Sequence, residues 1–236
     1  HILMIGMIVT FILTFFLLEH PFSFLLSFQG RAFAVNGSLS KGKLRGVGFI
    51  FVLCFLISSV LFLPIDVEYV IYAILLFAMM ISGYLDDASK TPWNEYKKGL
   101  IDLVISVVAV LTYMNFNSTT ICFGADEIVI PKALFLILGV ILIWVSVNVT
   151  NCTDGVDGLC ASLCSVTLLA FGVLFAPILQ KYAMANFLFL SVLFAYLYFN
   201  SSPSSMLMGD AGSRALGFYI AVIALKSTHP FIYILL

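Results

Sequence analysis

The sequence predicts an all-α, polytopic integral membrane helical bundle, and three observations predict it. Hydrophobic residues make up 62% of the 236 residues, charged residues make up only 10%, and the mean hydropathy is +1.14. Soluble domains carry about 45–50% apolar and about 25% charged residues. The apolar residues also lie in continuous runs, whereas strands of a membrane β-barrel alternate over about 10 residues. We expect residues 1–236 to form a single transmembrane domain.

Individual spans follow from the apolar runs, because a helix crossing about 30 Å of hydrocarbon needs about 20 mostly apolar residues and slightly shorter ones are tolerated. The candidate spans are 2–18, 47–63, 69–84, 100–114, 133–147, 159–178, 183–199 and 215–225. The first run lacks the basic flank and cleavage site of a signal peptide, so it is expected to be a span. The apolar run from Pro230 stops far short of a span, which predicts that C-terminal helices of a longer protein are missing.

Lys and Arg set the expected orientation. If the first span runs from outside to inside, the segments on the inner side hold Arg31, Lys41, Lys43, Arg45, Lys90, Lys97, Lys98 and Arg214, and the outer segments hold Lys132, Lys181 and Lys226. The positive-inside rule then places the first set in the cytoplasm. The net charge of −1 gives no reason to expect binding to nucleic acid.

Three polar segments, 85–98, 148–158 and 200–214, are separated by pairs of spans and therefore emerge on one face of the membrane. Their aspartates are Asp86, Asp87, Asp154, Asp157 and Asp210. Carboxylates at the ends of apolar helices are costly without a partner, so they indicate a functional site. Mutual repulsion predicts either protonation or a bound cation. Oxygen ligands without a His or Cys cluster favour Mg²⁺, Mn²⁺ or Ca²⁺.

Each segment also has a local interpretation: a solvated helix end at Asp86, turn dipeptides at Asp154 and Asp157, and a helix N-cap at Asp210. Their shared face favours a common site instead. Adjacent glycines let backbone N–H groups approach a ligand, and helices beginning after Gly158 and near Gly212 would direct their positive ends to phosphate. The residues alone therefore predict phosphoryl transfer involving a lipid at the cytoplasmic face.

The motifs resemble a known family. Asp-Asp-x-x-Lys begins at Asp86, Asn-x-x-Asn-x-Thr-Asp-Gly-x-Asp-Gly-Leu begins at Asn148, and Gly-Asp-x-Gly-Ser-x-Ala-Leu-Gly begins at Gly209. In this order the sequence resembles the polyprenyl-phosphate N-acetylhexosamine-1-phosphate transferases. Members that use UDP-N-acetylglucosamine usually have a hydrophobic residue where this chain has Thr153, which favours the members that use UDP-N-acetylmuramoyl-pentapeptide.

The resemblance implies an Mg²⁺-dependent transferase of peptidoglycan synthesis. It would convert UDP-N-acetylmuramoyl-pentapeptide and undecaprenyl phosphate to lipid I and UMP. It also implies a multi-pass bacterial inner-membrane protein of ten helices, usually a homodimer, with its active site facing the cytoplasm. The implied site residues are Asp210 as metal ligand, Asp86, Asp87 and Lys90 as catalytic residues, and Asn151, Asp154, Asp157, Asn200 and Lys43 on the nucleotide side. For Asp86 and Asp87, the roles left open are orienting the lipid phosphate, removing its last proton, binding metal or acting as nucleophile.

The chain departs from the family pattern in three places. The His-rich cytoplasmic loop after the ninth helix lies beyond this chain. Leu207 stands where the family usually has a uracil-stacking Phe, and the segment 42–48 matches the family's Gly-rich loop poorly. Two other functions remain as alternatives: transfer of N-acetylglucosamine-1-phosphate to a polyprenyl phosphate, and cation transport. Transport is disfavoured because transporter carboxylates usually lie near the bilayer midplane.

Overall fold

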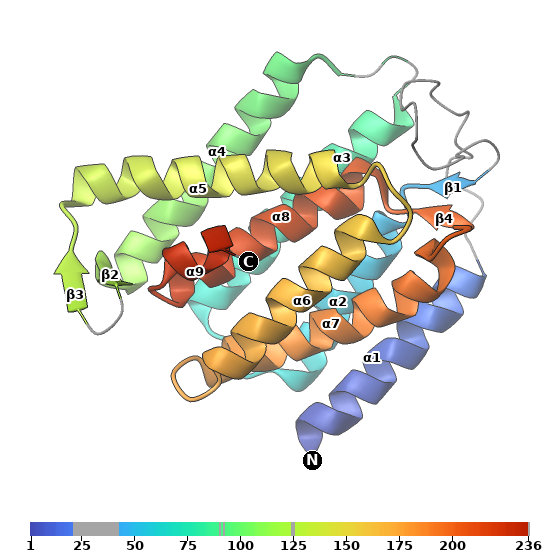
Figure 1. The fold of residues 1–236 in the computed structure, drawn as a ribbon, viewed down its shortest axis with the longest axis horizontal. Coiled ribbons are helices and arrows are strands. Elements are labelled where there is room, and N and C mark those ends of the chain that lie inside the picture. The colour runs from blue at the N-terminus through green and yellow to red at the C-terminus, as the bar shows by residue number, and fades with distance from the viewer. Residues whose placement is uncertain (21–42, 90, 92, 124–125, 236) are drawn as a thin grey trace.

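The fold was obtained as a computed structural model that describes residues 1–20, 43–89, 91, 93–123 and 126–235 (Figure 1). The helices are α1 (Ile2–Glu19), α2 (Gly48–Phe62), α3 (Val67–Ala88), α4 (Glu95–Phe116), α5 (Lys132–Thr153), α6 (Leu159–Leu174), α7 (Gln180–Asn200), α8 (Gly209–Lys226) and α9 (Pro230–Leu235). The short strands are β1 (Leu44–Arg45), β2 (Thr120–Phe123), β3 (Asp126–Val129) and β4 (Met206–Leu207).

The prediction of a polytopic helical membrane bundle is confirmed. Among the described residues, α1, α3, α4, α5 and α7 are long and apolar enough to cross a membrane, while α2 and α6 are shorter apolar helices. The chain is a multi-pass membrane protein. Apolar residues face outward along these helices, as expected where lipid is the solvent.

Several helices continue beyond the predicted apolar runs. α3 includes Asp86 and Asp87, α5 extends to Thr153, and α8 begins at Gly209 rather than near Gly212. The polar segments predicted as loops are therefore largely the ends of helices. The cause is that these polar residues have partners inside the bundle, so the helix hydrogen bonds continue past the apolar stretch. By contrast, α6 ends at Leu174, before the predicted Ile178.

Helix α8 lies at the centre of the bundle (Figure 1). Every one of its residues is buried. It packs chiefly against α3 and α5, with α2 and α6 also in contact, while α1 packs against α7 and α2. α2 and α8 cross almost backbone to backbone, because a Cβ atom on Gly48 would lie 2.2 Å from the Gly212 nitrogen. Only glycine allows this approach.

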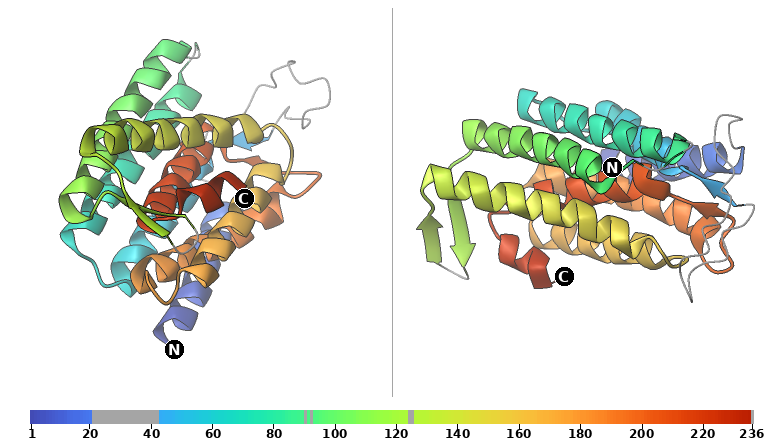
Figure 2. Two further views of the ribbon diagram at one scale, coloured as in Figure 1. Left: turned by 60° about the vertical axis from the view of Figure 1, so that its left-hand side comes forward. Right: turned by 90° about the horizontal axis from the view of Figure 1, so that it is seen from above.

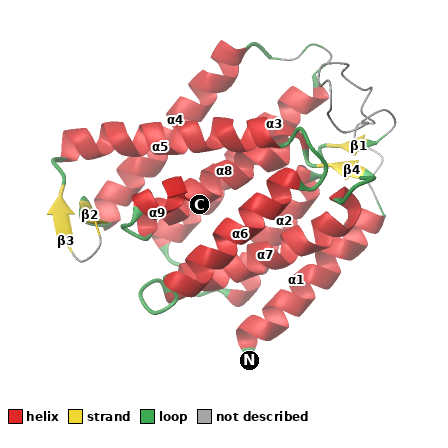
Figure 3. Ribbon diagram, viewed as in Figure 1, coloured by secondary structure: helices red, strands yellow, loops and turns green. Residues whose placement is uncertain are grey.

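Two small sheets lie at opposite ends of the bundle (Figures 2 and 3). β1 pairs in parallel with β4, and β2 pairs with β3 as an antiparallel hairpin. The sequence analysis predicted no strands. The β1–β4 pair matters most for function, because it fixes the segment before α2 beside the start of α8.

The opposite end of α8 carries a buried ion pair. Lys226 Nζ lies 3.0 Å from both carboxylate oxygens of Glu68, and it donates to Asn117 Oδ1 at 2.6 Å. These residues join the end of α8 to the start of α3 and the end of α4. The pair thus links three helices at one end of the bundle, and the predicted functional residues lie at the other end.

Candidate active site

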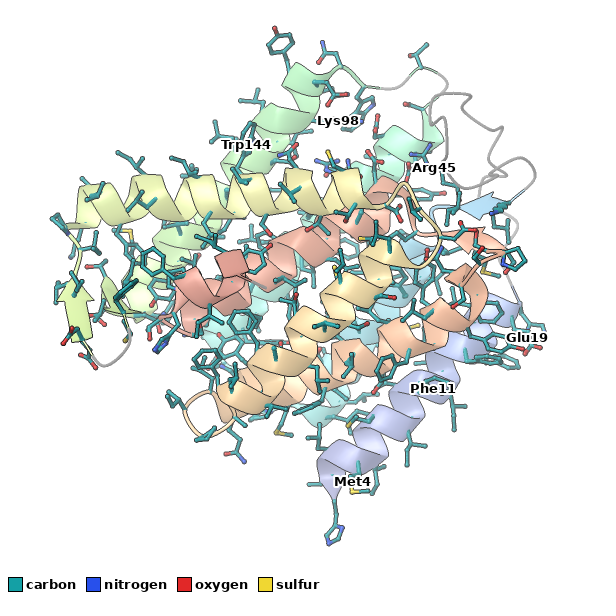
Figure 4. All side chains as sticks on the ribbon, viewed as in Figure 1. Met4, Phe11, Glu19, Arg45, Lys98 and Trp144 are labelled. Carbon is teal, nitrogen blue, oxygen red and sulfur yellow. The ribbon has the colours of Figure 1, made fainter. Side chains whose placement is uncertain are left out.

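Three of the predicted carboxylates meet at one end of the bundle, bridged by two cations. Arg45 Nη2 lies 2.8 Å from Asp87 Oδ1 and 3.2 Å from Asp210 Oδ1. Lys98 Nζ lies 2.6 Å from Asp86 Oδ2 and 3.3 Å from Asp210 Oδ2. Arg45 and Lys98, both labelled in Figure 4, lie toward the same end of the molecule. Side chains from β1, α3, α4 and α8 thus form one polar cluster, which we call the carboxylate cluster.

Close packing of α3 on the start of α8 builds this cluster. A Cβ atom on Gly83 would lie 2.4 Å from the carbonyl oxygen of Asp210, so the two backbones touch. Gly209 has φ +66° and stands beside Asp87 Oδ2, where a side chain would collide. Glycine at both positions is therefore needed to bring Asp87 next to the first turn of α8.

The adjacent aspartates have different surroundings. Asp86 accepts a hydrogen bond from the Trp93 backbone N–H at 2.7 Å and faces Lys98. Asp87 accepts from the Ala211 backbone N–H at 3.3 Å and faces Arg45. The side chain of Asp87 is only 1% exposed. Successive residues on a helix point about 100° apart, so one sequence motif supplies carboxylates to two sides of the cluster.

A second group of residues joins the segments 151–158 and 200–208. Asp157 accepts hydrogen bonds from the Ser204 backbone N–H at 3.0 Å and the Ser204 hydroxyl at 2.7 Å. Lys43 Nζ donates to the same hydroxyl at 2.7 Å and lies 3.4 Å from Asp157 Oδ2. Three predicted nucleotide-side positions, 43, 157 and 200, therefore lie on connected segments.

Asn200 is 2% exposed, and both ends of its amide are engaged. Its Oδ1 accepts from the Gly158 backbone N–H at 3.0 Å, and its Nδ2 donates to the Met206 carbonyl at 2.9 Å. This arrangement makes Asn200 a brace between two loops, a role that the sequence analysis did not predict. Leu207 lies next to this brace in β4, opposite Arg45 in the strand pair.

The remaining predicted nucleotide-side residues lie at the end of α5. Asn151 Oδ1 accepts from the Ser213 hydroxyl at 2.8 Å, which links α5 to α8. Asp154 follows as the C-cap of α5. Burial raises the pKa of the Asp154 carboxyl well above its usual value, and the negative charges of Asp210 and Asp87 add to this effect. Lys90, the remaining predicted catalytic residue, lies outside the described residues.

The sequence analysis did not assign Arg45 or Lys98 as site residues: it counted both as basic residues on the inner face, where Lys98 was expected only to add to the attraction for phosphate. The signal available for Lys98 was its position in the first turn of α4, next to the segment with the paired aspartates. Arg45 gave no such signal, because its contact with Asp210 depends on the pairing of β1 with β4.

The cluster fits a hard divalent cation by its donor chemistry, since carboxylate oxygens are the ligands that Mg²⁺ prefers. Asp210 directs its two oxygens to different cations, Arg45 and Lys98, and keeps 10% of its side chain exposed. Over the ranges that the structure describes, no three His, Cys, Asp or Glu side chains converge closely enough to hold a metal ion by themselves. Substrate oxygens or water would therefore have to complete the coordination of Mg²⁺.

The fold and the cluster together define a class: a multi-pass membrane transferase whose polar site lies at the ends of its helices. Residues 69–228 match glycosyl transferase family 4. A phospho-N-acetylmuramoyl-pentapeptide-transferase of Treponema pallidum is 34% identical, over 98% of this chain and 70% of that protein. One from Halalkalibacterium halodurans is 29% identical over 100% of this chain and 78% of its own length. One from Microcystis aeruginosa is 31% identical over 77% of this chain and 53% of its own length.

The chain belongs to glycosyl transferase family 4, in the branch of the phospho-N-acetylmuramoyl-pentapeptide-transferases.

Proposed function

We propose that this protein transfers phospho-N-acetylmuramoyl-pentapeptide from UDP to undecaprenyl phosphate, which gives lipid I and UMP at the cytoplasmic face of the bacterial inner membrane. The observation that carries the proposal is the carboxylate cluster, in which Asp86, Asp87 and Asp210 surround two cations at the end of the bundle. A lipid phosphate can reach this level from the bilayer, and a nucleotide can reach it from water. The strong similarity to transferases of this name supports the choice of substrates.

The reaction forms one bond to phosphorus and breaks another. An oxygen of the lipid phosphate attacks the phosphorus linked to the sugar, and the bond from that phosphorus to UMP breaks. A phosphate monoester has a second pKa near 6, so the nucleophile is mostly dianionic at neutral pH. A general base therefore contributes little, and the role of Asp86 and Asp87 is to orient the lipid phosphate and to accept its last proton when one is present.

Two like-charged substrates must approach each other, so positive charge is the main requirement. Arg45 and Lys98 supply two cations whose carboxylate partners hold them in place before substrate arrives. Fixed charges of this kind stabilise a phosphoryl-transfer transition state without reorganisation during the reaction. Lys90, for which the family resemblance implies a catalytic role, would add a third positive charge.

Mg²⁺, which we propose as the cofactor, would be held by Asp210 and would neutralise charge on the diphosphate and on the departing UMP. Asp86 or Asp87 could supply a second oxygen. Asp210 suits this role because it lies in the first turn of the central helix and its side chain is the most exposed of the three carboxylates, at 10%. This assignment leaves Asp87, whose side chain is the least exposed of the three, for positioning the lipid phosphate.

The nucleotide side is proposed to lie at segments 151–158 and 200–208. Asp157 and Lys43 join these segments through Ser204, and Asn200 braces them. Asn151 and Asp154 extend the same surface toward α8. We propose that Asn200 shapes the uracil pocket by holding its backbone, and that the assembled form is a homodimer, as the family resemblance implies.

The test uses the full-length protein in detergent with undecaprenyl phosphate and Mg²⁺. Labelled UDP-N-acetylmuramoyl-pentapeptide and labelled UDP-N-acetylglucosamine are offered separately, and label in the lipid fraction is counted. We expect label from the first donor only, and loss of at least about 100-fold in Asp210→Asn because that change removes a charged ligand of the cation. Label from the second donor only would replace the substrate. Label from neither would refute the proposal.

A further inference from the structure

A second ion pair lies one helical turn below the carboxylate cluster and has no part in the mechanism above. Arg214 Nη2 donates to Asp102 Oδ1, and their side chains are 1% and 2% exposed. Arg214 is on α8 and Asp102 is on α4. Ionisable side chains buried at membrane depth are costly and commonly have a functional reason.

The pair completes a square of alternating charge with two residues of the cluster. On α4, Lys98 is followed four residues later by Asp102, and on α8, Asp210 is followed four residues later by Arg214. Residues four apart are neighbours on one helix face. Lys98 bridges to Asp210 at 3.3 Å, and Asp102 bridges to Arg214, so each charge has an opposite charge beside it and across from it.

This pattern of charges fixes the register of the two helices, that is, the position of α4 along the axis of α8. A shift of one turn, about 5.4 Å, would place Lys98 opposite Arg214, or Asp102 opposite Asp210. Either arrangement brings like charges together in a buried setting. The constraint is needed here because α4 packs mainly against α3 and α5 and has little other contact with α8.

Asp102 is the residue that compensates the buried charge of Arg214. The Nε and Nη1 atoms of this arginine have no hydrogen-bond partner among the described residues. Removing the Asp102 carboxylate would leave a buried guanidinium without its counter-charge, which is the most damaging way to break a buried pair. The Asp102–Arg214 pair lies directly beside Lys98 and Asp210 of the carboxylate cluster. This location indicates a role beyond stability.

We propose that Asp102 and Arg214 are positioning residues: their buried bridge sets the register of α4 on α8 and thereby places the Lys98 ammonium between Asp86 and Asp210. The effect on turnover rests on the proposed function, whereas the placement of Lys98 does not. Displacement of a catalytic group by about 1 Å can lower a rate about 100-fold.

The test compares Asp102→Asn and the double variant Asp102→Arg with Arg214→Asp, each in the full-length protein. The double variant restores a bridge but puts two cations on α4 and two carboxylates on α8. We expect the turnover number of Asp102→Asn to be about 100-fold low. In the double variant a one-turn shift would keep only one of the two bridges, so the native register stays favoured, and both the unfolding temperature and the turnover number should recover toward wild type. KM for the nucleotide donor should change little.

Glu68→Gln is the matched control, because it breaks the buried pair with Lys226 at the other end of α8. We expect it to lower the unfolding temperature without a comparable fall in turnover number. A second readout needs no substrate: Lys98, whose side chain is 13% exposed, is labelled with an amine-specific reagent and quantified by mass spectrometry. Labelling should be faster in Asp102→Asn than in wild type, and unchanged in Glu68→Gln.

A turnover number in the double variant as low as that of Asp102→Asn, or unchanged labelling of Lys98 in Asp102→Asn, would overturn the inference. A fall in turnover that simply follows the unfolding temperature in every variant, Glu68→Gln included, would also overturn it. An inactive wild-type protein whose Lys98 still responds to Asp102→Asn would refute the proposed function and leave the positioning role standing.

Discussion

Replacing Gly83 by alanine tests whether the contact between α3 and α8 sets the geometry of the active site. The added Cβ atom would lie 2.4 Å from the Asp210 carbonyl oxygen and 2.6 Å from the Ala211 nitrogen. These are backbone atoms in the first turn of α8, so no side chain can rotate away. Ordinary contacts of a Cβ atom begin at 3.4 Å, and the two helices must therefore separate by about 1 Å.

The cluster is sensitive to this displacement because it joins the same two helices. Arg45 spans Asp87 and Asp210 with distances of 2.8 and 3.2 Å, and Lys98 spans Asp86 and Asp210 with distances of 2.6 and 3.3 Å. Moving α3 by about 1 Å breaks one bond of each cation. We expect the turnover number to fall about 100-fold, and the unfolding free energy to fall by about 1–3 kcal/mol from overpacking.

The assay is transfer of labelled donor to the lipid fraction, with thermal unfolding in detergent measured on the same preparations. Gly99→Ala in α4 is the control, because the nearest atom to its added Cβ would be 3.7 Å away on the Trp144 ring. Alanine also favours helix by up to about 1 kcal/mol over glycine. The control should keep wild-type turnover, with a stability equal to or slightly above that of wild type. A Gly83→Ala enzyme with wild-type turnover would show that the helix contact does not set the site geometry.

Three further predictions follow from individual contacts. Asp87→Asn keeps an acceptor for the Ala211 N–H but removes the charge that faces Arg45, so steady-state kinetics should show a loss in turnover number rather than in KM; a change in KM alone would contradict the positioning role. Asn200→Ala leaves the buried Met206 carbonyl and the partly buried Gly158 N–H without their side-chain partner, so the free energy of unfolding should fall by about 1–3 kcal/mol, and unchanged stability would refute the bracing role. Asp66 is the N-cap of α3. Partial burial raises its pKa, but the hydrogen bonds from Lys181 and from the Tyr69 backbone N–H lower it by more, so the folded-state pKa lies below its usual value. This N-cap stabilises the fold above the unfolded-state pKa and is lost as pH falls through the folded-state pKa, so Asp66→Ala should cost about 0.5–2 kcal/mol at neutral pH and progressively less in acid; a pH-independent cost would contradict it.

The hydropathy of the chain determined its class and most of its helices. Continuous apolar runs can satisfy their backbone in lipid only as helices, so composition and span length are sufficient to predict the bundle. The even number of spans between the aspartate motifs placed Asp86, Asp87 and Asp210 on one face, and the structure brings these three together at the carboxylate cluster. Helix ends were less predictable, because polar residues continue a helix wherever the bundle supplies their partners.

Only the tertiary structure decided which charges face each other. Arg45 reaches Asp210 through a strand pair that joins residues about 160 positions apart, and Asp102 meets Arg214 across two helices. Nothing local in the sequence distinguishes Arg45 from the other basic residues on its face. Asp102 lies inside the predicted span 100–114, but nothing near it in the sequence identifies Arg214 as its partner. A local pattern sets which face of a helix a residue occupies, but the depth and rotation at which two helices pack are set by backbone contacts such as Gly83 on Asp210 and Gly48 on Gly212, and those contacts arise only when the whole bundle is assembled.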